Sequence, residues 1–223
     1  GNWSITLTNP LPEGEVELFI IITDLEGNVS PPSPPLVVFV DTIAPDVVLS
    51  ASASTPHSGD FTVTATFTED VTGFDLADAV ISNGTAGNFA TTSASVYTFD
   101  VTPTVDGPVT VDLAEGAAQD IVAHPSTVAA QLSLTTDSTA PGITLSTTAT
   151  APYSGPFSVT ASFTEDVTGF ELSDVVVGNG TASDLVETSG QLYTVTVTPL
   201  ANGPVTVDVL AAAAQDVAGN DTP

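Results

Sequence analysis

The chain has 223 residues, of which 27 are acidic and none is lysine or arginine, so its formal net charge is −27. This charge argues against nucleic acid and against an anionic membrane surface as partners. Only 12% of the residues are charged while 42% are hydrophobic, a composition typical of folded domains rather than of an acidic disordered tail. Cysteine is absent, so a divalent cation, and not a disulfide, is the staple that the surplus carboxylates favour.

The sequence pattern of the first part of the chain predicts a partial Ig-like domain over residues 1–43. Three short segments read as strands, and they span 3–7, 15–22 and 36–40. They correspond to the last three strands of a β-sandwich. No apolar run is long enough to suggest direct membrane insertion.

From residue 44 onward the sequence repeats itself 96 positions later without an insertion. Ala44-Pro45 recurs as Ala140-Pro141, and Gln119-Asp120 recurs as Gln215-Asp216. A period of this length is one domain and not one turn of a solenoid. The repeat therefore predicts two further domains, over 44–139 and 140–223.

Each repeat reads as a set of short strands. Residues 61–67 alternate apolar side chains with threonine, the pattern of a half-buried strand, and Asn83-Gly84 and Asp106-Gly107-Pro108 are turn signals. The predicted strands of the first full repeat are 47–50, 61–67, 76–81, 87–91, 96–102, 109–113 and 129–135. Seven short strands in about a hundred residues predict an all-β fold, with tandem immunoglobulin-like β-sandwich domains in a linear array.

The repeat beginning at residue 140 stops before its last strand, so the domains at both ends are predicted to be incomplete. One explanation is that the sequence is part of a longer polypeptide. The other is that a second chain supplies the missing strand, as in donor-strand assembly, which would produce a head-to-tail filament.

The motifs of the repeat resemble those of a known family. They are Phe67-Thr68-Glu69-Asp70-Val71-Thr72-Gly73-Phe74, Asn83-Gly84-Thr85, Tyr97-Thr98-Phe99-Asp100-Val101 and Asp216-Val217-Ala218-Gly219-Asn220. With them the chain resembles the bacterial Ig-like repeats of large secreted adhesins and biofilm-matrix proteins. The resemblance implies an extracellular extender that is often stiffened by calcium. One departure is Ala123-His124, which stands where the next repeat has Gly219-Asn220.

Acidic side chains are expected to gather where two domains meet. In a seven-strand sandwich the loops after the second and sixth strands lie at the end where the chain enters, beside the linker. A calcium ion takes about six to eight oxygen ligands, and no lysine or arginine is present to balance these charges. The candidate ligands are Asp41, Glu69, Asp70 and Asp120 at one junction, and Asp106, Asp137, Glu165, Asp166 and Asp216 at the next.

Other residues have simpler interpretations. Asp75, Asp78, Glu171 and Asp174 border a strand and are expected to cap turns. His57 and His124 are not equivalent in the repeat and are interpreted as loop residues. No nucleophile motif, phosphate-binding glycine loop or zinc spacing is present, so no enzymatic activity is expected.

The sequence therefore predicts a structural spacer at the bacterial cell surface or in the extracellular matrix, with neighbouring Ig-like domains of the same chain as its partners. Alternatives are a subunit of a self-assembling filament, with like chains as partners, and a module that binds polysaccharide or ice. The last would need an exposed aromatic row or a flat threonine array. Tyr97 and Tyr193 are equivalent, but they alternate with outward threonines and are expected to point inward.

Overall fold

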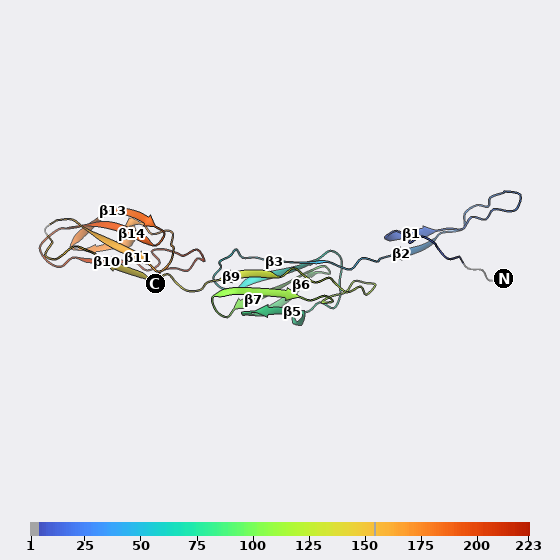
Figure 1. Cartoon of the computed structure of the whole chain (residues 1–223), viewed down its shortest axis with the longest axis horizontal. Helices are drawn as coiled ribbons and strands as arrows, with labels where there is room; N and C mark the ends of the chain where they lie inside the picture. The colour runs from blue at the N-terminus through green and yellow to red at the C-terminus, as the bar shows by residue number, and fades with distance from the viewer. Residues whose placement is uncertain (1–4, 154) are drawn as a thin grey trace.

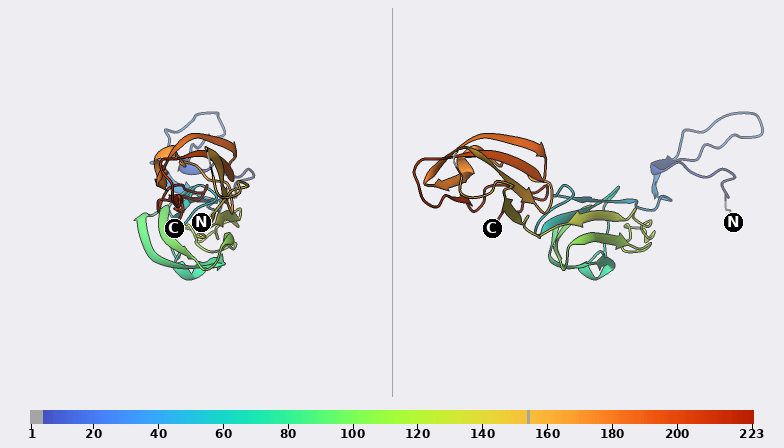
Figure 2. Two further views of the ribbon diagram at one scale, coloured as in Figure 1. Left: turned by 90° about the vertical axis from the view of Figure 1, so that its left-hand side faces the viewer. Right: turned by 60° about the vertical axis from the view of Figure 1, so that its left-hand side comes forward.

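The structure is a computed structural model that describes residues 5–153 and 155–223. Three parts follow one another in a row, a β-hairpin, a central sandwich and a second sandwich (Figure 1). The right-hand view of Figure 2 shows the two sandwiches as separate bodies joined end to end. The linear array predicted from the repeat is confirmed.

The central domain is a sandwich of two antiparallel sheets. The larger sheet has the order β3-β4-β7-β6, from the strands Val47–Ala51, Phe61–Phe67, Val96–Pro103 and Gly84–Ser93. The smaller sheet has the order β5-β8-β9, from Ala79–Ser82, Gly107–Leu113 and Leu132–Thr136. This division into four and three strands is that of an immunoglobulin constant-type domain, as predicted.

The third domain repeats the arrangement with one strand fewer. Its larger sheet has the order β10-β11-β14-β13, from Ile143–Ser146, Phe157–Phe163, Leu192–Pro199 and Gly180–Ser189. Its smaller sheet pairs β12 (Val175–Gly178) with β15 (Thr206–Val209). Within the described residues, no strand pairs with the second edge of β15.

The first part of the chain is a single antiparallel hairpin of β1 (Gly14–Leu18) and β2 (Leu36–Val40). The predicted strand over 36–40 is confirmed, and the one over 15–22 is shorter than predicted. Of the strand predicted over 3–7, residues 1–4 lie outside the described residues, and 5–7 form no strand. Large apolar side chains of the hairpin, such as Leu36 and Phe39, are exposed.

Three strand predictions in the central domain are wrong in their bounds, and one of them is 129–135, since β9 begins only at Leu132. The segment predicted as a strand over 76–81 begins with a 3-10 helix, η1 (Leu76–Asp78), and β5 starts only at Ala79. The Asp75 carboxylate accepts a hydrogen bond from the Ala77 amide, and Asp78 accepts one from the Asp75 amide. This reciprocal capping box stabilises the helical turn.

The third wrong prediction is the strand over 87–91, since β6 runs from Gly84 to Ser93. The pairing of β6 with β7 shifts register between Gly87 and Ala90, where Asn88 has a positive φ of 51°. A bulge of this kind interrupts the alternation that marks a strand in the sequence, so the pattern indicated only part of β6.

Tyr97 lies inside the central sandwich, as predicted. Its ring meets those of Phe67 and Phe74 edge to face, with centroids 5.9 and 5.1 Å away. The Tyr97 hydroxyl donates to the Val71 carbonyl at 3.1 Å. Tyr193 repeats this arrangement by donating to the Val167 carbonyl. The tyrosine therefore ties the loop after the second strand to the core, and this loop holds Glu69 or Glu165.

Candidate metal centres at the domain junctions

Two loops are fastened together at the end of each sandwich where the chain enters. In the central domain, the amide of Thr72 donates to the carbonyl of Gln119 at 2.7 Å, and the Gln119 amide returns a bond to Thr72 at 3.0 Å. Thr168 and Gln215 repeat the exchange in the third domain, at 2.8 and 2.9 Å. These bonds fix the loop that follows β4 or β11 beside the loop that follows β8 or β15.

Asp120 is the fixed point of the first junction and is only 2% exposed. Its Oδ1 accepts hydrogen bonds from the amides of Val122 and His124 at 2.8 and 2.9 Å. Its Oδ2 lies 2.9 Å from His124 Nδ1. Burial opposes ionisation, but the bonds from His124 and Val122 prevail and hold the pKa of Asp120 below its ordinary value.

Asp216 has the same place at the second junction, where it is 5% exposed. Its Oδ1 accepts from the Asn220 amide at 2.9 Å, and its Oδ2 accepts from Asn220 Nδ2 at 2.8 Å. The same Asn220 Nδ2 donates to the linker carbonyl of Asp137 at 2.9 Å. The loop therefore holds the linker as well as its own aspartate. Burial opposes ionisation here too, but the pKa of Asp216 is lowered by its bonds to Asn220.

At each junction, three side chains come together, from the linker and both loops at the second junction and from the linker and the loop after β8 at the first. Asp137, Glu165 and Asp216 each place one oxygen so that the three atoms lie within 4.8 Å of one another. At the first junction the corresponding group is Asp41, Asp120 and His124, within the same limit. The first group thus contains a nitrogen ligand, and the second contains oxygen only.

The two glutamates lie in a strongly negative field. Desolvation raises the pKa of the Glu165 carboxyl, and the charges of Asp137 and Asp216 raise it further. Desolvation likewise raises the pKa of Glu69, with added contributions from Asp41 and Asp120. Although Glu69 is not in the first group of three, it lies close enough to feel both aspartates. A cation at either junction would relieve this repulsion.

Asp106 has a different position from the other candidates. Its carboxylate accepts hydrogen bonds from the amide and hydroxyl of Ser138, both at 2.7 Å, and from the Thr139 hydroxyl. The hydroxyls of Thr139 and Ser138 and the Ser138 amide lower the pKa of Asp106. Asp106 also adds to the raised pKa of Glu165. It therefore lies beside the second group and holds the linker in place.

Asp70 and Asp166 are outside both groups. Asp166 lies against the turn between β13 and β14, where a Cβ on Gly190 would come within 2.9 Å of its carboxyl carbon. The structure thus brings together Asp41 with Asp120 and, one repeat later, Asp137 with Glu165 and Asp216, with Glu69 and Asp106 adjacent.

A family model described as a bacterial Ig-like domain matches residues 41–136 and again 137–223. The chain belongs to this family. No curated protein matches the sequence. No helix in the described part of the chain has the length and apolar character needed to span a bilayer.

Three solved structures show similarity to these bacterial Ig-like domains. InvD of Yersinia pseudotuberculosis is 18% identical over 80% of this chain and 56% of its own, with a TM-score of 0.37. The adhesin InvE of the same organism is 18% identical over 70% and 51%, with a TM-score of 0.28. A marsupial T cell receptor is 8% identical over 86% and 64%, with a TM-score of 0.23. The chain spans about half the length of the two Yersinia chains, and TM-scores this low assign it no function.

The sequence interpretation missed one residue of the first junction, Glu13. Its carboxylate accepts hydrogen bonds from the amide and hydroxyl of Thr42, the linker residue next to Asp41. Asp106 does the same for Ser138 one domain later. The sequence carried a signal for it, because Glu13 stands just before Gly14, the first residue of β1, as Asp106 stands just before Gly107, the first residue of β8, and both glycines have positive φ.

His124, which the sequence marked as a departure and which was interpreted as a loop residue, belongs to a loop motif that occurs three times among the described residues. Asp24 binds the amide and side chain of Asn28 as Asp216 binds those of Asn220. His124 takes the asparagine position in the central bacterial Ig-like domain. The residue before it has positive φ in each copy, 89° at Gly27, 70° at Ala123 and 90° at Gly219. Only the central copy places a side chain there.

Proposed function

We propose that this chain is a section of an extracellular bacterial spacer, in which calcium ions at the junctions hold successive Ig-like domains in a rigid line. Its role is mechanical and not enzymatic. The observation that supports it best is the group Asp137, Glu165 and Asp216, because it joins the linker to two loops of the next domain. A related group one repeat earlier, Asp41, Asp120 and His124, joins the linker to one loop of the central domain.

The donor set fits calcium. Calcium binds oxygen ligands at about 2.3–2.6 Å, so ligands of one ion lie within about 5 Å of each other. The three oxygens of the second junction, within 4.8 Å, satisfy this limit. Magnesium fits less well because it requires a tight octahedron and gives up its water reluctantly.

Further oxygens are available around the second junction. The Asp106 carboxylate lies beside the group and accepts from the Ser138 amide, and the Asp137 carbonyl is held there by Asn220. At the first junction, His124 Nδ1 already binds Asp120 Oδ2. Since calcium prefers oxygen to imidazole nitrogen, we expect the first site to be the weaker one.

Rigidity is the functional consequence of such an ion. The second linker is already fastened on both sides, by Asp106 behind it and by Asn220 of the next domain ahead, and the first linker is fastened behind it by Glu13. A cation that binds the linker and the next domain would remove the remaining freedom between them. With 27 acidic groups and no basic side chain in the chain, the acids at a junction without a cation would repel one another and weaken the contact between the two domains.

The test is a calcium titration of the metal-stripped chain by calorimetry, together with small-angle X-ray scattering in calcium and in EGTA. We expect saturable binding, a higher melting temperature and a longer, narrower distance distribution in calcium. A matched control is Asp208→Asn, which removes one exposed acid of β15 away from the junctions. If the scattering profiles in calcium and in EGTA coincide and the titration shows no heat of binding, the acids only keep the chain soluble, and the proposal is overturned.

The filament alternative predicts assembly that depends on protein concentration, and sedimentation velocity tests it. The polysaccharide or ice alternative gains no support from the equivalent aromatic side chains, since Tyr97 and Tyr193 are only 6% and 4% exposed.

A further inference from the structure

The two junction groups differ in one type of ligand, and this difference decides which metal each can hold. The group at the first junction is Asp41, Asp120 and His124, whose ligand atoms lie within 4.8 Å of one another. Calcium and magnesium take oxygen ligands, whereas an imidazole nitrogen suits zinc, copper, nickel and similar first-row ions. Two carboxylates with one imidazole are therefore the donor set of a transition-metal site and not of a calcium site.

The spacing of these atoms also fits zinc. Zinc binds imidazole nitrogen at about 2.0–2.1 Å and carboxylate oxygen at about 2.0–2.2 Å, so two ligands of one tetrahedral ion lie about 3–3.5 Å apart. His124 Nδ1 lies 2.9 Å from Asp120 Oδ2, which is close to that spacing. When the imidazole proton is on Nε2, the lone pair of Nδ1 is free to bind an ion. An ion between the two atoms would then replace the hydrogen bond.

A second observation concerns the linker and does not depend on this spacing. At the second junction, Asn220 Nδ2 donates both to Asp216 Oδ2 and to the carbonyl of the linker residue Asp137. An amide nitrogen carries two hydrogens, but His124 Nδ1 carries at most one, which its own loop takes. In the described part of the chain, no hydrogen bond joins Asp41 to the loop of His124. An ion bound by Asp41 and His124 would supply the tie that the first linker lacks.

The surroundings of the group provide a path for the ion and a further ligand. The Asp120 side chain is buried, but that of His124 is 35% exposed, so an ion can enter from solvent beside the imidazole. Desolvation raises the pKa of Glu69, Asp41 and Asp120 raise it further, and His124 lowers it. The Glu69 carboxylate thus lies near the same ion, and either this group or a water molecule can complete a tetrahedron.

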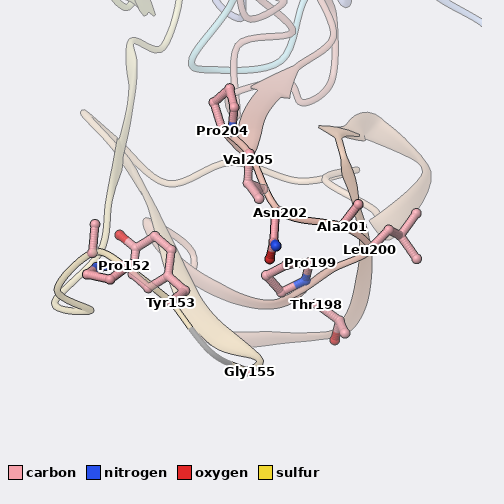
Figure 3. A pocket seen from close by; sticks show the side chains of 12 residues that line it. Pro152, Tyr153, Gly155, Thr198, Pro199, Leu200, Ala201, Asn202, Pro204 and Val205 are labelled. Carbon is pink, nitrogen blue, oxygen red and sulfur yellow. The ribbon is translucent and has the colours of Figure 1, made fainter.

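We infer that the first junction is a zinc site held by Asp41, Asp120 and His124, while the second junction is the calcium site. The inference rests on the proposed function, because it assigns a different ion to one of the two junctions. A chain of this kind needs both ions to be rigid along its whole length. A cavity in the third domain, between Tyr153 and the segment from Thr198 to Val205 (Figure 3), has no acid or histidine among its described lining residues, so it offers zinc no competing ligands.

The experiment titrates the metal-stripped full chain with zinc chloride by calorimetry, in a buffer without calcium or chelator. One zinc ion should bind tightly, in addition to weak binding by exposed acids. Because the chain has only two histidines, nitrogen NMR of the imidazoles can follow each of them. Zinc should shift the Nδ1 signal of His124 and leave the signals of His57 in place.

Three variants provide the comparison. His124→Asn gives the loop the residue that Asn220 supplies one repeat later, so it should fold, and it should lower the zinc affinity at least about tenfold because the nitrogen donor is lost. His57→Asn is the matched control, with the same change at the other histidine, and should leave zinc binding unchanged. Asn220→His should give the second junction a zinc site, so that two ions bind tightly.

Equal zinc affinities of the parent chain and of folded His124→Asn would overturn the inference, because surface acids alone would then hold the ion. An unshifted His124 imidazole at saturating zinc would overturn it as well. The proposed function fails on a separate result, namely that calcium changes neither the melting temperature of the third domain nor the scattering profile. That result is independent of where zinc binds.

Discussion

The central and third domains share their motifs and their strand register, but their smaller sheets differ by one strand. The larger sheets match pair by pair, from Val47↔Phe67 to Ile143↔Phe163. The smaller sheets do not, because β9 has no counterpart among the described residues of the third domain. Phe61, which is 3% exposed in the central domain, corresponds to the partly exposed Phe157.

This difference separates two parts of the folded domain that depend on different residues. The four-stranded sheet and the junction loops form in the same way with and without the last strand, so they depend on the residues within each repeat. Closure of the opposite end of the core depends on the strand. The following predictions test that separation.

The largest expected effect is on the central domain when its last strand loses a core side chain. Leu134 is 5% exposed and lies in the cluster with Val109 and Val111. Leu134→Ala should cost about 2–5 kcal/mol, because the lost burial is joined by a cavity. Differential scanning calorimetry should show the transition of the central domain move down towards that of the third.

The control for this change is Val128→Ala, a side chain that is 65% exposed just before the same strand. It should alter stability by less than about 0.5 kcal/mol. If Leu134→Ala leaves the upper transition in place, then β9 does not close the core as the burial indicates.

Most of the fold could be predicted because local patterns repeat. The alternation in 61–67 and the offset of 96 residues were sufficient for the sandwich and for its loop arrangement. The errors fall where a side chain and not the alternation decides the backbone. Asp75 and Asp78 build a helical turn at the start of a predicted strand, and Asn88 introduces a bulge in another.

The site was predictable to the same extent. Strand order alone placed Asp137, Glu165 and Asp216 at one end of the domain, and the structure brings them within 4.8 Å. What order cannot give is the direction of a side chain, so Asp166, adjacent to Glu165, was included although it lies against Gly190. His124 was read as an ordinary loop residue because its tie to Asp120 is evident only when the loop motif is seen folded.

The second prediction compares the two junctions in calcium. At a free calcium concentration of about one hundred times the dissociation constant, one site adds about 2.7 kcal/mol to stability, or roughly 10–20 °C for a domain of this size. Asp216→Asn should abolish this gain in the third domain. Asp120→Asn should abolish a smaller gain in the central domain, because its site contains His124.

The quantity to compare is the difference between melting temperatures in calcium and in EGTA, since either aspartate also holds its own loop. Asp208→Asn serves as the control with the same change in charge. If calcium raises the melting temperatures of the two domains equally, the oxygen-only group and the group with a histidine do not differ in calcium affinity as expected.

The third prediction concerns the loop motif, where the central copy has Ala123 at a φ of 70°. A residue with a Cβ in the left-handed region costs about 1–2 kcal/mol, and a change to glycine removes this cost. Glycine also gives the unfolded chain more conformational entropy, which offsets part of that gain in stability. Ala123→Gly should therefore stabilise the central domain by about 0.5–1 kcal/mol in urea unfolding. Gly219→Ala should destabilise the third domain by a similar amount. Two changes of the same sign would show that the copies differ in more than this residue.

The smallest expected effect is the pH dependence of the difference in stability between Glu165→Gln and the parent chain. It is also the effect that best distinguishes a metal ligand from a solvated acid. Because the pKa of Glu165 is raised in the folded chain, its protonated form favours folding. Without calcium, this contribution is present below the ordinary value of about 4.3 and is lost as the pH rises through the raised value. The metal-stripped variant and parent chain should thus be equally stable at pH 3.5, and the variant should be more stable at pH 7 in EGTA by less than about 1 kcal/mol.

Calcium should reverse that sign at pH 7, because the variant lacks a charged ligand that the parent chain uses. Glu187→Gln, on the exposed face of β13, should show neither the pH dependence nor the reversal. An advantage for Glu165→Gln that is the same in calcium and in EGTA would mean that the ion does not use this carboxylate. The junction acids would then differ from other surface acids only in how closely they are held together.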